Sequence, residues 1–122
     1  MALFNTTSFR ITNQALDALW LKQRTISHNL ANSDTPGYKA KHVKFSGILV
    51  DKMNANKDVR NKKELHLQAE VIADESTNQR FDENNVDVEQ QQLELARAQI
   101  QYDTLIEKMT GQFTTLRTAM RL

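Results

Sequence analysis

The side chains that could carry out chemistry in this sequence are three histidines, a run of carboxylates and a serine beside a histidine. His28, His42 and His66 stand in separate predicted elements, without the close spacing that builds a metal site. The 122 residues include no cysteine, which excludes a disulfide framework, a thiolate metal site and a cysteine nucleophile. Ser27 directly precedes His28, and adjacency in sequence is no evidence of a nucleophile and its base.

The carboxylates gather in a polar stretch. Between Asp74 and Glu89 they alternate with turn-forming residues, and no apolar pocket is predicted there that would raise a carboxyl pKa for acid–base catalysis. The three glycines stand alone, which excludes a glycine-rich phosphate loop. We therefore expect no catalytic residues, no cofactor-binding residues, no metal ligands and no enzymatic activity.

Charge is unevenly distributed, although the net charge is only +1. Residues 39–63 contain eight basic and two acidic residues, and residues 64–94 contain nine acidic residues and one arginine. The segment from Tyr38 to Phe45 interleaves lysines with aromatic residues, as nucleic-acid-binding surfaces do, but the acidic block disfavours that function. Two adjacent blocks of opposite charge could pair within the chain or make head-to-tail contacts between copies. The alternative is that both blocks are solvent-exposed surfaces that do not pair.

A first helix is predicted at the N-terminal end, from near Ser8 or Thr12 to about Asn32. Apolar side chains recur along it in steps of three and four residues, which places them on one face. Trp20 lies beside that face. We expect this side chain to pack at the edge of the core, with an anchor in an interface as the alternative.

A second helix is predicted from Asn85 or Asp87, either of which can cap it, to about Ala119. It too carries an apolar seam, and such seams form surfaces that pack against another helix. Two seams at the two ends of a chain favour an assembly function over catalysis. The residues of the predicted assembly seam are Leu16, Leu19, Ile26, Leu30, Val88, Leu95, Tyr102, Leu105, Met109, Phe113 and Leu116.

The middle of the chain is predicted to contain β-structure. Residues 32–37 read Asn-Ser-Asp-Thr-Pro-Gly, which ends the first helix decisively. Apolar and polar residues alternate over residues 64–72, which predicts a half-buried strand. Residues 43–50 are compatible with a short strand or an irregular apolar anchor. Residues 54–63 are predicted as a mobile loop and residues 80–82 as another short strand.

The predicted fold is mainly α. Long helices at the N- and C-termini pair as a coiled coil, and a short β-containing or irregular segment connects them. We divide the chain into residues 1–37, the N-terminal helix with its Thr-Pro-Gly turn, residues 38–84, the β-hairpin or loop segment, and residues 85–122, the C-terminal helix.

Two segments of the sequence resemble bacterial flagellar rod, hook and related axial proteins. In that family an N-terminal helix ends in an Asn-(Leu or Ile)-Ala-Asn…Thr-Pro-Gly-Tyr stretch, and residues 26–39 read Ile-Ser-His-Asn-Leu-Ala-Asn-Ser-Asp-Thr-Pro-Gly-Tyr-Lys. Residues 82–89 read Asp-Glu-Asn-Asn-Val-Asp-Val-Glu, which resembles the segment before the last helix of a proximal rod subunit, with Glu83 where a glycine is usual. The residues that carry the resemblance are Asn29, Ala31, Asn32, Asp34, Thr35, Pro36, Gly37, Tyr38, Asn84, Asn85, Val86 and Asp87.

The resemblance implies a structural subunit of the proximal rod of the flagellar basal body. Such a subunit is exported by the flagellar type III apparatus without a cleaved signal. Its terminal helices form the tube that links the membrane ring and export gate to the distal rod and hook. The implied partners are further copies, FlgC and other rod proteins, FliE and the export gate, with no nucleic acid, no small-molecule substrate and no membrane span. A FlgC-like sibling, which the Asn-Asn-Val-Asp segment disfavours, and a cytoplasmic helical adaptor are the alternatives.

Overall fold

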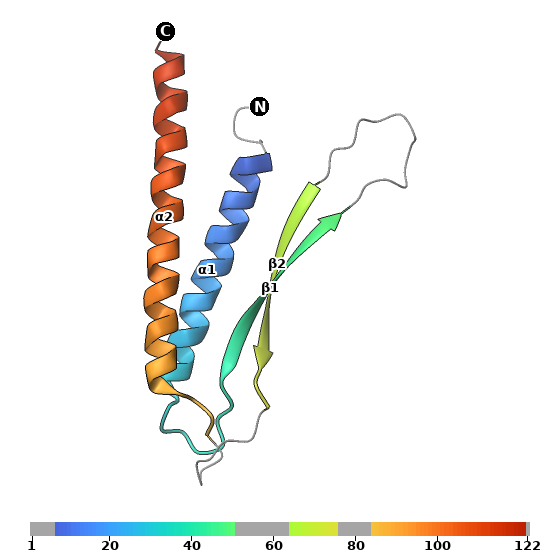
Figure 1. Cartoon of the computed structure of the whole chain (residues 1–122), viewed down its shortest axis with the longest axis vertical. Helices are drawn as coiled ribbons and strands as arrows, with labels where there is room; N and C mark the ends of the chain where they lie inside the picture. The colour runs from blue at the N-terminus through green and yellow to red at the C-terminus, as the bar shows by residue number, and fades with distance from the viewer. Residues whose placement is uncertain (1–6, 51–63, 76–83, 122) are drawn as a thin grey trace.

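Two long helices and a two-stranded sheet make up the computed structural model, which describes residues 7–50, 64–75 and 84–121. The elements are helix α1 (Thr7–Ala31), strand β1 (Lys41–Val50), strand β2 (Glu64–Ala73) and helix α2 (Val88–Met120). The helices lie side by side in opposite directions, and the paired strands lie beside α1 (Figure 1). The predicted mainly α fold with a short β-containing middle is confirmed.

The apolar core lies between α1 and α2. Its α1 residues are Leu16, Leu19 and Ile26, whose spacing places them on one face of the helix. Ala98, at 0% exposed, is the buried apolar residue of α2. Because alanine has a small side chain, it permits a close approach of the two helices at this point. The core is therefore narrow, and much of each helix surface is left for other contacts.

Two contacts fix the antiparallel register of the helix pair. Near the start of α1, Phe9 meets Phe113 edge to face, with ring centroids 5.2 Å apart. Further along, the side-chain amide of Gln23 donates a hydrogen bond to the backbone carbonyl of Ala98 at 3.5 Å. In this register the C-terminal end of α2 extends beyond the start of α1 (Figure 1).

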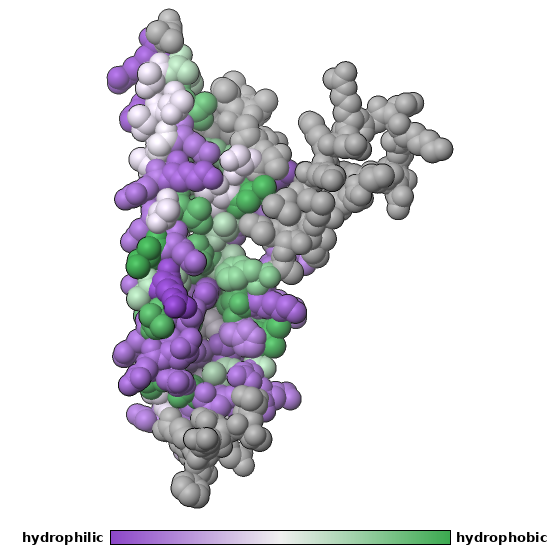
Figure 2. Space-filling model, in the orientation of Figure 1, coloured by the Kyte–Doolittle hydropathy of each residue, from purple (hydrophilic) through white to green (hydrophobic). Residues whose placement is uncertain are grey.

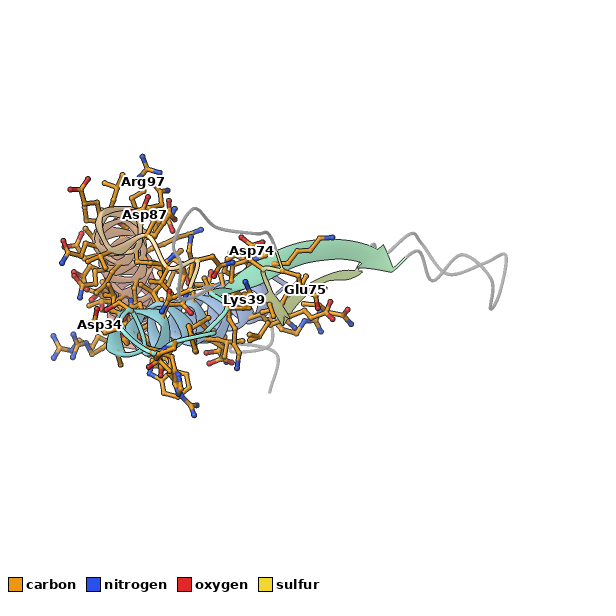
Figure 3. All side chains as sticks on the ribbon, turned by 90° about the horizontal axis from the view of Figure 1, so that it is seen from below. Asp34, Lys39, Asp74, Glu75, Asp87 and Arg97 are labelled. Carbon is orange, nitrogen blue, oxygen red and sulfur yellow. The ribbon has the colours of Figure 1, made fainter. Side chains whose placement is uncertain are left out.

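The two strands pair antiparallel from Lys41 opposite Ala73 to Val50 opposite Glu64. The strand predicted over 64–72 is confirmed and extends to Ala73, and the segment with two possible interpretations, 43–50, belongs to a strand. Lys22 of α1 lies over the Phe45 ring of β1, 6.0 Å from its centroid. Beyond this point the strands lead away from the helix pair (Figures 1 and 3). The predictions for residues 54–63 and 80–82 lie outside the described residues.

The expected position of Trp20 at the edge of the core is wrong, because its side chain is 54% exposed. Trp20 is two residues from Lys22, which contacts the sheet, and two residues correspond to about 200° around a helix. The indole therefore lies on the side of α1 that faces away from the sheet. The guanidinium of Arg24 lies over the indole, 5.3 Å from the ring centroid.

Candidate functional site

The two motif segments, far apart in sequence, meet where α1 ends and α2 begins. We call this site the asparagine junction and define it by Asn29, Asn32, Asn84 and Asn85. Figure 3 views the molecule from this end, with Asp34, Lys39, Asp74 and Asp87 labelled around it. The junction joins three elements, because its hydrogen bonds connect the end of α1, the base of the sheet and the start of α2.

Asn29 uses its full hydrogen-bonding capacity at this junction. Its Nδ2 donates to the Lys41 carbonyl at 2.6 Å and to Oε1 of Gln91 at 3.0 Å. Its Oδ1 accepts from the Lys41 amide at 2.9 Å and from the Tyr38 hydroxyl at 3.0 Å. The side chain is fully buried, and an amide has two donor hydrogens and two acceptor lone pairs. This single residue of α1 therefore fixes both β1 and α2.

Asn84, in the motif segment before α2, binds the end of α1. Its Nδ2 points at the carbonyls of Asn32, Ser33 and Thr35, at 2.9, 3.0 and 2.9 Å. Its Oδ1 accepts from the Val86 amide at 2.8 Å, and the side chain is fully buried. The last carbonyls of a helix and the turn after it lack partners within the helix. Asn84 supplies partners there and so couples the end of α1 to the start of α2.

Asn85 ties the base of the sheet to the same point. Its Nδ2 donates to the Asp74 carbonyl at 2.8 Å, and its Oδ1 accepts from the Ala40 amide at 2.6 Å. The Asp74 amide in turn donates to the Ala40 carbonyl at 2.7 Å. Of the two predicted caps of α2, Asp87 is the one observed, because its side chain accepts from the Gln90 amide at 3.1 Å.

The turn after α1 is held by local hydrogen bonds. Asn32 donates from Nδ2 to the His28 carbonyl at 2.8 Å, and the Thr35 hydroxyl donates to Asn32 Oδ1 at 3.1 Å. Gly37 adopts φ of 73°, in the left-handed region that favours glycine. The turn delivers Tyr38 to Asn29, and burial raises the pKa of the Tyr38 hydroxyl above its usual value.

The structure brings together most of the motif residues. Tyr38 bonds to Asn29, and Asn32, Thr35 and Asn84 bond to one another. Asn85 bonds to the backbone of Ala40 and Asp74, Val86 is buried and Asp87 caps α2. Ala31 at the end of α1 and Asp34 and Pro36 in the turn are exposed. Gln91 is a junction residue that the motifs do not include. The sequence could have indicated this role, because Gln91 lies seven residues before Ala98 and that spacing places both residues on the side of α2 that faces α1.

The seam residues divide into three groups by exposure. Leu16, Leu19 and Ile26 are buried, and the half-buried members are Leu30, Leu95, Tyr102, Leu105, Met109 and Leu116. Val88 and Phe113 remain exposed on the surface, because they lie toward one flank of α2, away from its buried centre at Ala98.

The chemistry of the junction is that of a rigid structural joint. Its side-chain groups are amides and hydroxyls that already form hydrogen bonds with backbone groups and with one another. Beside it, a hollow of about 280 Å³ lies between α1, β1 and α2, and its Lys22 and Glu94 pair with each other at 3.3 Å. Among the described residues, no cluster of three or more potential metal ligands occurs and no helix is long and apolar enough to cross a membrane.

Comparison with known proteins identifies the family of this chain. A family model described as flagella basal body rod protein matches residues 9–39, which span most of α1 and the turn that follows. The FlgB protein of Bacillus subtilis (strain 168) is 34% identical, and the match covers 98% of this chain and 97% of that protein. The chain belongs to the FlgB family of flagellar basal body rod proteins.

Two further FlgB proteins match over most of their length. FlgB of Aeromonas hydrophila is 30% identical over 99% of this chain and 98% of its own, and FlgB of Escherichia coli (strain K12) is 24% identical over 86% of each. As a FlgB-family member, the chain is a structural subunit of the proximal rod and is located in the flagellar basal body rod. Membership of the family implies assembly with other rod and basal body components.

Proposed function

We propose that the helix pair of this chain lies side by side with the helix pairs of neighbouring subunits to form the wall of a tube, without any catalytic role. The observation that carries the proposal is a row of large apolar side chains on one flank of α2. Val88, Ile106, Phe113 and Met120 are between 39% and 66% exposed. The last three follow one another at intervals of seven residues, about two helical turns, so they share a flank.

Covering this flank with a neighbouring subunit would release free energy, because apolar side chains leave water. Complete burial of a large apolar side chain is worth about 1.5–3 kcal/mol, so covering the exposed part of each is worth about 1 kcal/mol. Four such residues per subunit give a modest contact, but a tube repeats it around the wall and along the axis. In this proposal the buried seam residues and the Phe9–Phe113 contact hold the helix pair together, and the exposed parts of Val88 and Phe113 contact the neighbours.

We also assign specific neighbours to this surface: further copies of the chain, FlgC and other rod proteins, FliE and the export gate. Family membership supports assembly with rod and basal body components in general. A photo-crosslinking residue at position 106, used in intact basal bodies, tests the assignment. Adducts with rod proteins, FliE or export-gate proteins support it, and adducts confined to other proteins contradict it.

Ile106→Glu tests the wall contact itself. The side chain is exposed, so the variant should fold, with the helical circular dichroism of the parent chain, and should still be exported. Rods should be missing from electron micrographs and motility should be lost. The matched control is Gln101→Glu, which adds the same charge at an exposed position on another side of α2. A motile Ile106→Glu strain with normal rods would contradict the proposal.

Leu105→Glu and Met109→Glu should also block rod assembly. These two side chains are half-buried in the helix pair, so a charge there would disturb the monomer as well. Ile106 therefore separates assembly from folding better than either of them.

A further inference from the structure

We infer that neighbouring copies of this chain meet front to back, with the outer side of α2 of one copy against an edge of α1 of the next. We define the outer side of α2 by Leu93, Ile100 and the carboxylates around them, and the α1 edge by Trp20 and Arg24. The inference rests on the proposed function and specifies which surfaces of the subunit meet.

The outer side of α2 points away from α1 and carries uncovered apolar residues. Ile100 is two residues, or about 200°, from the buried Ala98, and Leu93 is seven residues before Ile100. Their side chains are 67% and 47% exposed, respectively. Figure 2 shows isolated hydrophobic spots among hydrophilic side chains along this outer edge of α2. These residues lie on a different side of the helix from the flank of Ile106 and Phe113.

The outer side is also acidic. Glu89, Asp103 and Glu107 are exposed, and their spacing of three, four or seven residues from Leu93 or Ile100 places them on the same side. Arg97 points to the side of α2 away from α1 (Figure 3). Its guanidinium pairs at 3.2 Å with Glu94, whose carboxylate also pairs with Lys22 of α1. The surface thus combines two exposed apolar residues with an excess of negative charge.

The α1 edge has complementary chemistry. Trp20 is 54% exposed, and the exposed Arg24 guanidinium is held 5.3 Å from its ring centroid. Stacking on the indole orients the guanidinium, which binds carboxylates through paired hydrogen bonds. Tryptophan and arginine are also the residues most enriched at the energetic centres of interfaces. Asp17 borders the edge, so positive charge is concentrated at its Arg24 end.

The complementary surfaces occur on the same chain, and this commits the partner to a second copy. An apolar and acidic surface matches an aromatic and basic one in both respects. Because the two surfaces differ, their contact is head to tail. Such contacts generate rings or helical arrays, as a tube requires, rather than closed pairs.

Cysteine cross-linking tests the inference, because the chain contains no cysteine of its own. Ser27→Cys places a thiol three residues from Arg24, and Ala96→Cys places one between Leu93 and Ile100. Both native side chains are small and exposed. A disulfide requires Cα atoms within about 7 Å, and the two positions lie on separate, outward-facing helix surfaces of one subunit, so a bond must join two subunits.

The doubly substituted chain should support motility, and its oxidised basal bodies should yield a band of twice the subunit mass on non-reducing gels. The control pair, Ser27→Cys with Lys108→Cys, uses an exposed position on another side of α2 and should yield none. A motile strain without the dimer band, or with cross-links only to a protein of different mass, overturns the inference. Motility itself reports separately on the proposed function.

Charge reversal provides a second measurement that does not depend on disulfide geometry. Arg24→Glu should reduce the number of rods per cell at least tenfold, and adding Asp103→Arg should restore most of them. Asp103 is the outer-side carboxylate that Arg24 can reach when Ser27 lies against Ala96. If Arg24→Glu leaves the number of rods unchanged, or if Asp103→Arg lowers it further, the assigned contact is wrong.

Discussion

Replacing Asn84 with alanine tests whether the asparagine junction stabilises the fold. The substitution removes the contacts of Nδ2 with the carbonyls of Asn32, Ser33 and Thr35 and the bond that Oδ1 accepts from the Val86 amide. The side chain is fully buried, so the groups left behind are poorly placed to bind water. Nδ2 has two donor hydrogens, so about three hydrogen bonds are lost in all. At about 1 kcal/mol for each, the free energy of unfolding should fall by about 3 kcal/mol.

Urea unfolding of the purified chain, followed by circular dichroism, measures this loss. With a denaturant dependence of about 1–3 kcal/mol per molar urea, the midpoint should fall by about 1–3 M. Asn13→Ala is the matched control, because Asn13 is exposed on α1 and alanine favours the helix. Its midpoint should stay the same or rise slightly. Equal midpoints for Asn84→Ala and Asn13→Ala would refute a stabilising role for the junction.

Asn84→Asp adds a pH signature to the same test. A carboxylate at this position would face three carbonyl oxygens, so the folded state should favour its protonated form and raise its pKa above the usual value of about 4. Folding stability should then recover as the pH falls through the raised pKa, and be lost as it rises. A variant whose urea midpoint, relative to that of the parent chain, is independent of pH would contradict this geometry.

Further predictions concern the turn, the tyrosine and the end of α2. Gly37→Val should lower the free energy of unfolding by about 1–2 kcal/mol, because φ at this position is 73°. Gly111→Ala, in open space within α2, should raise it by about 1 kcal/mol. Urea midpoints equal to that of the parent chain would contradict both predictions. Because the pKa of Tyr38 is raised in the folded state, its contribution to folding stability should be complete below a pH of about 10 and be lost as the pH rises through the folded-state pKa. In thermal unfolding at alkaline pH, Tyr38→Phe should therefore lose less stability than the parent chain. In the monomer, amides of residues 114–120 should exchange hydrogen faster than those near Ala98, measured by mass spectrometry, since this end of α2 extends beyond α1.

Both helices and one strand could be predicted from sequence because their signals are local. The three- and four-residue steps of Leu16, Leu19 and Ile26 identify the buried face of α1 directly, and alternation identifies β2. The expectation that Trp20 packs at the edge of the core is wrong, although a large apolar side chain favours burial. Whether a residue at the margin of a seam is covered depends on the size of the side chains that the neighbouring helix presents at that point. At the α2 contact, the buried neighbour is the small Ala98.

The motif residues could be found from sequence, but their pairing could not. Asn29 and Asn84 each occupy a segment that looks like a helix terminus, and local capping explains such asparagines adequately. Their actual partners include Lys41, Gln91 and the carbonyl of Thr35, which depend on the path of the turn and on the register of the helix pair. Burial of an amide whose hydrogen bonds are all made is a property of three elements together.

Polar residues fix the shape of this small chain, and exposed apolar residues are left to drive its assembly. Hydrogen bonds are directional, so the junction sets the angle between helix pair and sheet with little apolar area. The apolar interaction is non-directional and scales with area, so Trp20, Ile100 and Phe113, which the monomer leaves exposed, are suited to supply association free energy. If the same residues were instead buried to stabilise the monomer, the helix surfaces would lose the driving force for packing against neighbours. A narrow core and a fully satisfied polar joint are therefore what a subunit needs to keep its shape while its helix faces remain available.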